Sequence, residues 1–265
     1  MPEQSYPMQI IVSTIGTPNY GISMYLVKLI QPILNENPTR LKNSQQFVEK
    51  AKSWDISSDK IQVSLDVINL YPSIPLKEVA EGLIRLLEVS DNFKKATKLN
   101  IKEIKILIGL CLYRPDFLWN NEIHELENSG PIGLSFMEVL AESFLQHLEK
   151  RALNTALKNN PLIDLKSFYR NVDDSHARFP NIAHANQFKR ILNQQHPKIQ
   201  YTIELENDKK TLNFLDISKI NNKSGKYEFK IHRKNAITNI QVKATSNHDL
   251  FKFLNFKWNI QGFRT

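Results

Sequence analysis

Two acidic strand ends, far apart in the sequence, constrain the fold of this chain more than any other feature. The first is Asp66, near the end of Ile61–Val67, a run in which apolar and polar residues alternate. The second is the doublet Asp173-Asp174, which closes the short run Phe168–Val172. Alternation with a period of two indicates a β-strand. If the two strands lie side by side, their carboxylates meet at one edge of a sheet.

A group of carboxylates at a sheet edge suits a particular chemistry. Mg²⁺ prefers oxygen ligands and keeps water or phosphate in its remaining positions. Two such ions about 3.5–4 Å apart can stabilise the attacking and leaving oxygens of a phosphoryl transfer. Asp66, Asp173 and Asp174 are therefore candidate metal ligands. The alternative is that they lie in solvated turns, since the chain has 27 acidic residues.

The order of the predicted elements supports the first interpretation. With two of the helices after Asp66 set aside, the order is strand, helix, strand, strand, helix, strand, the split βαβ arrangement of ferredoxin-like folds. In that topology the first strand and the hairpin carrying Asp173-Asp174 at its turn are central neighbours. The expected strands are 61–66, 199–205, 212–217 and 227–231, and the expected helices are 21–34, 75–88, 101–112, 137–153 and 184–195.

Composition indicates a globular chain with a core of its own. Of the 265 residues, 41% are hydrophobic, which excludes a disordered chain and allows one large domain or two small ones. The single cysteine, Cys111, excludes an internal disulfide framework and favours a reducing compartment. The polar N-terminus does not resemble a signal peptide, and no apolar run reaches the roughly 18 residues of a membrane span. We expect an intracellular protein, nuclear or cytoplasmic, without a membrane partner.

The positive charge is concentrated at the C-terminal end. Residues 223–265 contain nine Lys or Arg and two acidic residues, which account for +7 of the net charge of +8. Phenylalanines and Trp258 are interleaved with these cations. Such a segment suits a phosphate backbone and stacked bases. The alternative is an ordinary basic surface over core aromatics.

Several segments, in order and spacing, resemble the reverse transcriptases of Penelope-like retroelements. The similarity extends over nearly the whole chain. The segments are IVSTIGTP (11–18), SLDV (64–67) with YPSIP (71–75), NVDD (171–174), HPKIQ (196–200), FLD (214–216), HRK (232–234) and SNH (246–248).

This resemblance implies an α+β fold, a right-hand polymerase palm built on the split βαβ antiparallel sheet. It implies partial fingers over 1–55, a palm over 56–235 with a helical fingers insertion at about 90–125, and the start of a thumb over 236–265. The implied function is RNA-directed DNA synthesis by two-metal nucleotidyl transfer with Mg²⁺ or Mn²⁺. The implied partners are an RNA or DNA template-primer and dNTPs.

Roles transfer from the family only to matching residues. Asp66 and Asp173 would hold both metals, with Asp174 assisting. Tyr71 would crowd a ribose 2′-hydroxyl and so favour dNTPs, unless it is simply a core aromatic. Gly133 would belong to the loop beside the nucleotide. The nucleic-acid contacts would come from Arg233, Lys234, Lys252 and Lys257.

The sequence also departs from the family. The loop motif YxQxxGxAMGSP has Leu126, Ser129 and Leu134 at its Gln, first Gly and Ser positions, and retains Gly133. Asn171 replaces the aromatic residue before Val-Asp-Asp. Gln9-Ile10 stands in place of Arg-Pro, which removes an expected phosphate contact.

These changes predict impaired templating. The sequence also indicates a truncated and partly decayed element that starts in the fingers and stops in the thumb, without a GIY-YIG endonuclease. Two alternatives stay open: a non-catalytic nucleic-acid-binding remnant, and a two-metal nuclease on another fold.

Overall fold

The computed structural model describes residues 17–54, 60–112, 116–119, 122–125, 133–158, 165–222 and 226–232. The helices are α1 (Pro18–Leu34), α2 (Ser44–Lys52), α3 (Leu70–Ser73), α4 (Leu76–Val89), α5 (Asp91–Ala96), α6 (Ile101–Leu112), α7 (Ser135–Lys158) and α8 (Ile182–Asn193), with a 3₁₀ turn at Leu165–Ser167. The strands are β1 (Ile61–Val67), β2 (Asp116–Trp119), β3 (Glu122–Glu125), β4 (Tyr169–Asn171), β5 (Asp174–Phe179), β6 (Tyr201–Leu205), β7 (Thr211–Phe214), β8 (Ile217–Asn221) and β9 (Tyr227–Ile231).

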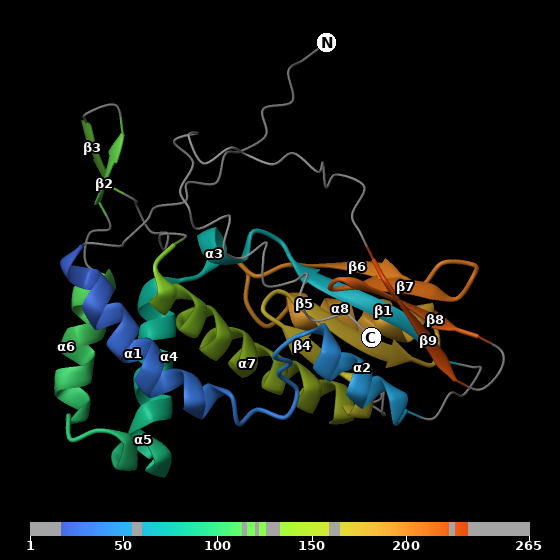
Figure 1. Ribbon diagram of the computed structural model, residues 1–265, viewed down its shortest axis with the longest axis horizontal. Helices are drawn as coiled ribbons and strands as arrows, with labels where there is room; N and C mark the ends of the chain where they lie inside the picture. Colours follow the sequence, from blue (N-terminus) through green and yellow to red (C-terminus); the bar gives the residue numbers. More distant parts are fainter. Residues whose placement is uncertain are drawn as a thin grey trace, which may run out of the picture. The chain divides into compact units, whose positions relative to one another are not determined.

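The main sheet is antiparallel, with the strand order β4-β5-β1-β6 (Figure 1). Helices α3 to α7 connect β1 to β4, and α8 connects β5 to β6. This is the split βαβ order, with β1 and β5 as central neighbours. The predicted topology is therefore confirmed.

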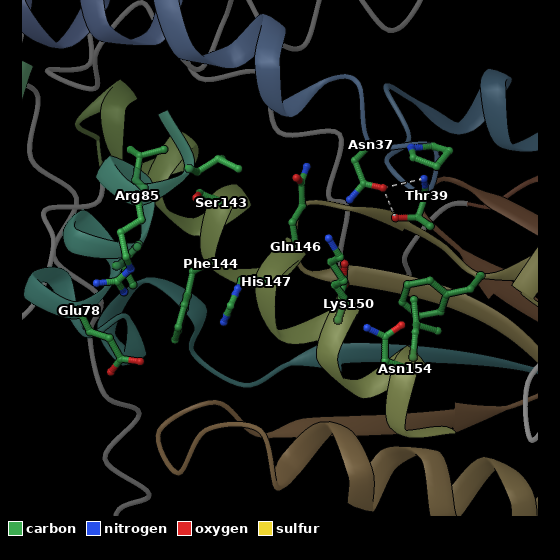
Figure 2. A pocket seen from close by; sticks show the side chains of 18 of the residues that line it. Asn37, Thr39, Glu78, Arg85, Ser143, Phe144, Gln146, His147, Lys150 and Asn154 are labelled. Atoms are coloured by element: carbon green, nitrogen blue, oxygen red, sulfur yellow. Dashed lines mark hydrogen bonds between the residues drawn. The ribbon is translucent and has the colours of Figure 1, made fainter. Parts of the chain in front are cut away.

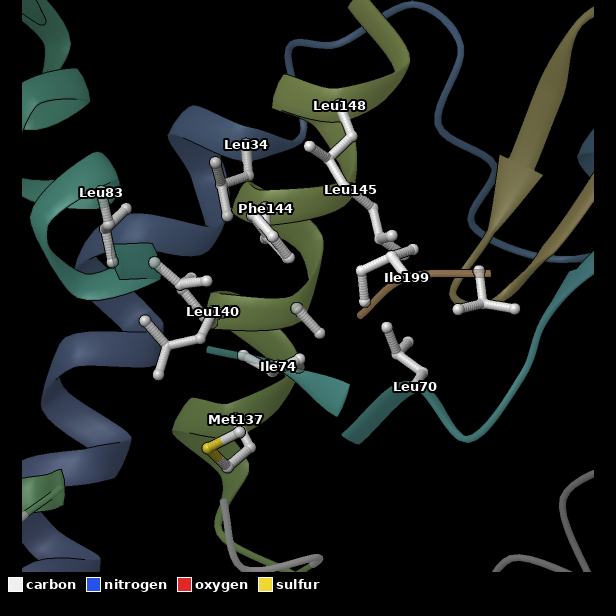
Figure 3. Close-up of a cluster of buried hydrophobic side chains, with 14 of the residues drawn as sticks. Leu34, Leu70, Ile74, Leu83, Met137, Leu140, Phe144, Leu145, Leu148 and Ile199 are labelled. Atoms are coloured by element: carbon white, nitrogen blue, oxygen red, sulfur yellow. The ribbon is translucent and has the colours of Figure 1, made fainter. Parts of the chain in front are cut away.

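Helix α7 runs through the centre of the hydrophobic core and packs against α1, α4 and α8 (Figure 3). Its first half is buried nearly all round, because both apolar stripes of the helix have neighbours. Met137, Leu140, Phe144 and Leu148 form the stripe that the sequence predicts, and all four are at most 5% exposed. The helix is longer than predicted and continues to Lys158.

A second core forms where α2 meets the three-stranded sheet β7-β8-β9.

The exposure of β1 differs from the prediction. The alternation in β1 predicts a polar face carrying Gln62, Ser64 and Asp66, yet Gln62 and Ser64 are buried. The Gln62 Nε2 atom donates to the Glu206 carboxylate at 3.0 Å, and Glu206 directly follows the neighbouring strand β6. Of these polar residues, only Asp66 is exposed.

Some boundaries differ from the predictions. The predicted strand 212–217 is wrong, because the chain reverses at Leu215-Asp216 and forms β7 and β8 instead. Leu215 adopts a left-handed φ of 57° at this turn, a conformation that Gly or Asn adopts more readily, so the sequence carries no usual turn residue at this position. The β2-β3 hairpin was also not predicted.

The predicted start of the thumb, 236–265, lies outside the described residues, as do residues 1–16 of the predicted fingers. Those domain boundaries stay predictions. Within the described residues, no helix is both long and apolar enough to span a membrane.

Candidate active site

The fold brings the two predicted acidic segments together at one end of the central strands. Asp66 in β1 pairs directly with Asp174 in β5. Residues directly opposite in an antiparallel pair have Cα atoms roughly 4.5–5.5 Å apart and side chains on the same face. Asp66 is exposed and Asp174 is half-buried, so solvent reaches this end of the sheet.

Asp173 lies in the two-residue turn between β4 and β5. The sequence predicts both aspartates at the turn, but the turn residues are Val172 and Asp173, and Asp174 begins β5. Val172 has a left-handed φ of 54°. Tight hairpins favour positive φ because it matches the twist of the strands, but a β-branched residue rarely adopts it. The turn is therefore a strained segment next to a candidate ligand.

Tyr71 lies close enough to Glu138 and Asp173 for their charges to act on it. It is half-buried in α3, and burial together with the charges of Glu138 and Asp173 raises the pKa of its hydroxyl to about 12. The phenol therefore stays protonated at neutral pH and can donate a hydrogen bond. Glu138 was not among the predicted site residues, although its position in the first turn of α7 could have suggested a role.

Gly133 precedes α7 with a φ of 117°, a conformation that side chains other than glycine rarely adopt. This backbone requirement holds whatever the residue binds. Leu134, at the family's Ser position, is 3% exposed and belongs to the core. The start of α7 is tied to α1, since the Phe136 amide donates to Ser23 Oγ at 3.0 Å. Residues 126–132 of this loop lie outside the described residues.

Asn171, at the family's aromatic position, has a specific partner here. Its Nδ2 atom donates to the Leu41 carbonyl at 3.1 Å, which ties the end of β4 to the segment before α2. The departure from the family pattern therefore leaves the strand end anchored.

The donor set at this end of the sheet fits a hard divalent cation. Asp66, Asp173 and Asp174 offer only carboxylate oxygens, the ligands that Mg²⁺ prefers. Among the described residues, no three His, Cys, Asp or Glu side chains are grouped so as to hold a metal ion by themselves. An ion here would therefore rely on one or two carboxylates, with water or phosphate oxygens completing its shell.

The remaining predicted site residues are not described. Arg233, Lys234, Lys252 and Lys257 lie outside the described residues, and their roles stay predictions.

A cavity of about 890 Å³ lies between α4, α7 and residues 37–39 (Figure 2). Glu78 and Arg85 on α4 and His147 and Lys150 on α7 line it, together with apolar side chains of both helices. None of the predicted site residues is among its lining residues. Asp66, Asp173 and Asp174 thus lie at one end of the central strands and do not line this cavity.

No protein-family model matches the sequence, and no curated protein matches it. Solved structures do. Telomerase from Candida albicans in complex with a TWJ fragment of telomeric RNA aligns at 12% identity and a TM-score of 0.57, covering 91% of this chain and 42% of telomerase. Apo telomerase from Candida tropicalis aligns at 8% identity and a TM-score of 0.56, covering 80% of this chain and 40% of that one.

A structure of an RNA-dependent RNA polymerase with vp4 and dsRNA aligns at 12% identity and a TM-score of 0.58. It covers 80% of this chain and 20% of the polymerase. The chain therefore spans less than half the length of each of these proteins. At such identities the similarity establishes the fold alone, which is that of the polymerase palm, as the sequence predicts.

Proposed function

We propose that this chain is the catalytic domain of an RNA-templated DNA polymerase, with activity weakened by changes in its nucleotide loop. The observation that carries the proposal is the direct pairing of Asp66 with Asp174, next to Asp173 in the turn, on a palm fold. Asp66 and the Asp173-Asp174 doublet come from two segments far apart in the chain, and at this end of the central strands Asp66 is exposed and Asp174 half-buried. Structural similarity to telomerase and to an RNA-dependent RNA polymerase supports the same conclusion.

In this proposal Asp66 and Asp173 hold two Mg²⁺ or Mn²⁺ ions and Asp174 assists. When bound, the ions would stabilise the negative charge on the attacking oxygen of a primer 3′-hydroxyl and on the leaving oxygen of the nucleotide phosphates. The residues of the chain contribute oxygen ligands on one face, so that water and phosphate oxygens can complete each shell.

Tyr71 is proposed to select the nucleotide. Tyr71 is half-buried in α3, the short helix that follows the strand bearing Asp66, and the charges of Glu138 and Asp173 act on its hydroxyl. A rigid ring at this position would exclude a ribose 2′-hydroxyl and so favour dNTPs. Gly133 would allow the backbone to approach the nucleotide, because it has no side chain.

We further propose that the domain derives from a retroelement of the Penelope-like group. The support is the set of ordered segments in the sequence, from SLDV through NVDD to HRK. Arg233, Lys234, Lys252 and Lys257 are proposed to contact the template–primer.

A primer-extension assay tests the activity. A primed RNA template, dNTPs and either Mg²⁺ or Mn²⁺ are combined with the wild-type chain and with Asp173→Asn. We expect slow extension by the wild type. The variant should be more than about 100-fold slower, since even partners outside the first ligand shell contribute about 10–100-fold.

Three outcomes would contradict parts of the proposal. Extension as fast with Asp173→Asn as with the wild type would exclude the metal role of that residue. Metal-independent binding of the primed template without any extension would identify a non-catalytic remnant. Cleavage of unprimed nucleic acid without dNTPs would identify a nuclease instead.

A further inference from the structure

The side chain of Arg170, in β4 immediately before the acidic turn, is buried in the protein. It is 1% exposed, and no predicted role accounts for it. A buried guanidinium is strongly destabilising unless its charge and its hydrogen-bond donors are matched. Its partners therefore indicate what it does.

Two carboxylates of helix α7 neutralise Arg170. Its Nη1 and Nη2 atoms donate to both oxygens of Glu142, at 2.9 and 2.8 Å, and its Nε atom donates to Glu149 at 2.6 Å. This forked geometry is specific to arginine, because lysine has no planar donor pair. Gln146 and Arg40 also bind Glu142, at 2.7 and 3.3 Å, and fix its orientation.

One further donation from Arg170 reaches the turn itself. Its Nη1 atom donates to the Val172 carbonyl at 2.9 Å. That carbonyl belongs to the peptide bond that leads into Asp173. Val172 carries the left-handed φ of 54°, a conformation that costs of the order of 1–3 kcal/mol and persists only where the surroundings hold it.

The backbone of Arg170 is fixed as firmly as its side chain. Its amide donates to the Thr39 carbonyl at 2.8 Å, and its carbonyl accepts from the Leu41 amide at 2.7 Å. Arg170 therefore connects three parts of the chain: its backbone binds the 39–41 segment, and its guanidinium binds helix α7 and the turn.

Helix α7 also reaches the site directly. Glu138 lies one helical turn before Glu142, so the two share a face of the helix, and the charge of Glu138 acts on Tyr71 as does that of Asp173. The pairing of Arg170 with Glu142 thus sets the turn and α7 relative to each other.

We propose that Arg170 is a positioning residue that holds the Val172 carbonyl and thereby presents Asp173 to the metal. This inference rests on the proposed function. It assigns a role to the Arg170–Glu142–Glu149 network beyond stabilising the fold. Weakening the network should loosen the turn before it unfolds the protein.

Two variants and one matched control test this role. Arg170→Lys removes the planar guanidinium, whose donors bind the Glu142 carboxylate and the Val172 carbonyl at the same time. Glu142→Gln keeps the shape of the side chain that binds Arg170 but removes its charge. This second variant tests the role even if Arg170→Lys does not fold. Arg178→Lys is the control: Arg178 is buried in β5, but its guanidinium lies over Trp54 at 4.9 Å and donates to Tyr227 at 3.3 Å, away from the turn.

The first measurement is hydrogen exchange of the amides of residues 171–175 in the metal-free protein. We expect exchange at least about 10-fold faster in Arg170→Lys and moderately faster in Glu142→Gln. Exchange requires the turn to open locally, and in these variants opening costs less free energy because the bonds of Arg170 are missing or weaker. Arg178→Lys should exchange these amides as the wild type does. Unchanged exchange in both network variants, or equal acceleration in the control, would overturn the inference.

The second measurement is Mn²⁺ binding by electron paramagnetic resonance, which needs no catalysis. Loss of an outer partner typically weakens metal binding about 10–100-fold, so Arg170→Lys should fall in that range and Arg178→Lys should match the wild type. If the wild type binds no Mn²⁺ and extends no primer, the proposed function fails, while hydrogen exchange still decides whether Arg170 holds the turn. If the wild type binds Mn²⁺ and Arg170→Lys and Glu142→Gln bind it equally well, the positioning role fails instead.

Discussion

Asp66 in β1 stands directly opposite Asp174 in β5, so two carboxylates from distant parts of the chain project from the same face of the sheet. Like charges directly opposite in a sheet destabilise it. A cation between them would remove that repulsion. The arrangement therefore favours metal binding at the expense of the stability of the metal-free protein.

The first prediction follows from this pair. Asp66→Asn should raise the unfolding free energy of the metal-free protein by roughly 0.2–1 kcal/mol, because it removes cross-strand repulsion. The same change should abolish the stabilisation that Mn²⁺ gives the wild type. Urea unfolding with and without Mn²⁺ measures both effects, and a destabilised metal-free variant would show that the repulsion is not significant.

Tyr71 should control the choice of sugar. Tyr71→Ala should raise incorporation of ribonucleotides relative to deoxyribonucleotides by about 10–200-fold, the discrimination that a steric contact of this size supports. Tyr71→Phe should keep the wild-type preference, because it keeps the ring. Single-nucleotide extension with paired rNTP and dNTP concentrations gives the ratio. An unchanged ratio in Tyr71→Ala would mean that the ring serves only the core.

Glu149 should make stability depend on pH. Burial raises the pKa of its carboxyl to about 7, although Arg170 acts to lower it. A group with a raised folded-state pKa contributes stability that is full below its unfolded pKa of 4.5 and is lost as pH rises through about 7. Glu149→Gln should therefore remove a decline in unfolding free energy between pH 4.5 and 7. Parallel urea-unfolding profiles for the two proteins over this range would contradict the assignment.

Cys111 should be unreactive in the folded protein. It is 3% exposed, and burial raises the pKa of its thiol to about 11. The thiolate is the reactive form, and a rise from 9.0 to about 11 lowers its fraction at pH 8 by about 100-fold. Because it is the chain's one cysteine, labelling with a chromogenic disulfide reagent reports on it alone. Rapid labelling without denaturant would show that α6 opens readily.

The basic C-terminal segment should bind template–primer through its phosphates. Replacing Arg233 and Lys234 with Ala should reduce the slope of log K against log[salt] by roughly 0.9 for each phosphate of duplex DNA that the protein no longer neutralises. Fluorescence anisotropy over a range of salt concentrations measures the slope. Affinity that is indifferent to salt, or unaffected by deletion of 223–265, would exclude this role.

Local patterns in the sequence were enough to predict much of this fold. Helix α6 and strand β9 begin and end at the predicted residues, because apolar periodicity and turn residues mark them directly. The order of elements then predicted that β1 and β5 are neighbours, and with it the meeting of Asp66 and the acidic doublet. Few topologies connect those elements in that order.

Other features depend on contacts between distant segments. Periodicity within β1 places Gln62 on a polar face, but in the tertiary structure Gln62 is buried and donates to Glu206, which lies 144 residues away next to β6. The reversal at Leu215 was missed because leucine is not a typical residue of a tight turn, where Gly, Asn or Asp usually supplies the positive φ.

Arg170 is the clearest case of such a contact. Glu142, Gln146 and Glu149 lie on one face of α7, and Glu142 and Glu149 are buried among apolar residues, which requires an internal partner that the sequence does not identify. The sequence by itself determined the acidic doublet and the apolar stripes of the core, which follow from short-range patterns, and the strand order, which follows from the order of the elements. Only the tertiary structure decided that a guanidinium from β4 binds the carboxylates of α7 and the carbonyl of the turn, because that choice rests on where three separate segments meet.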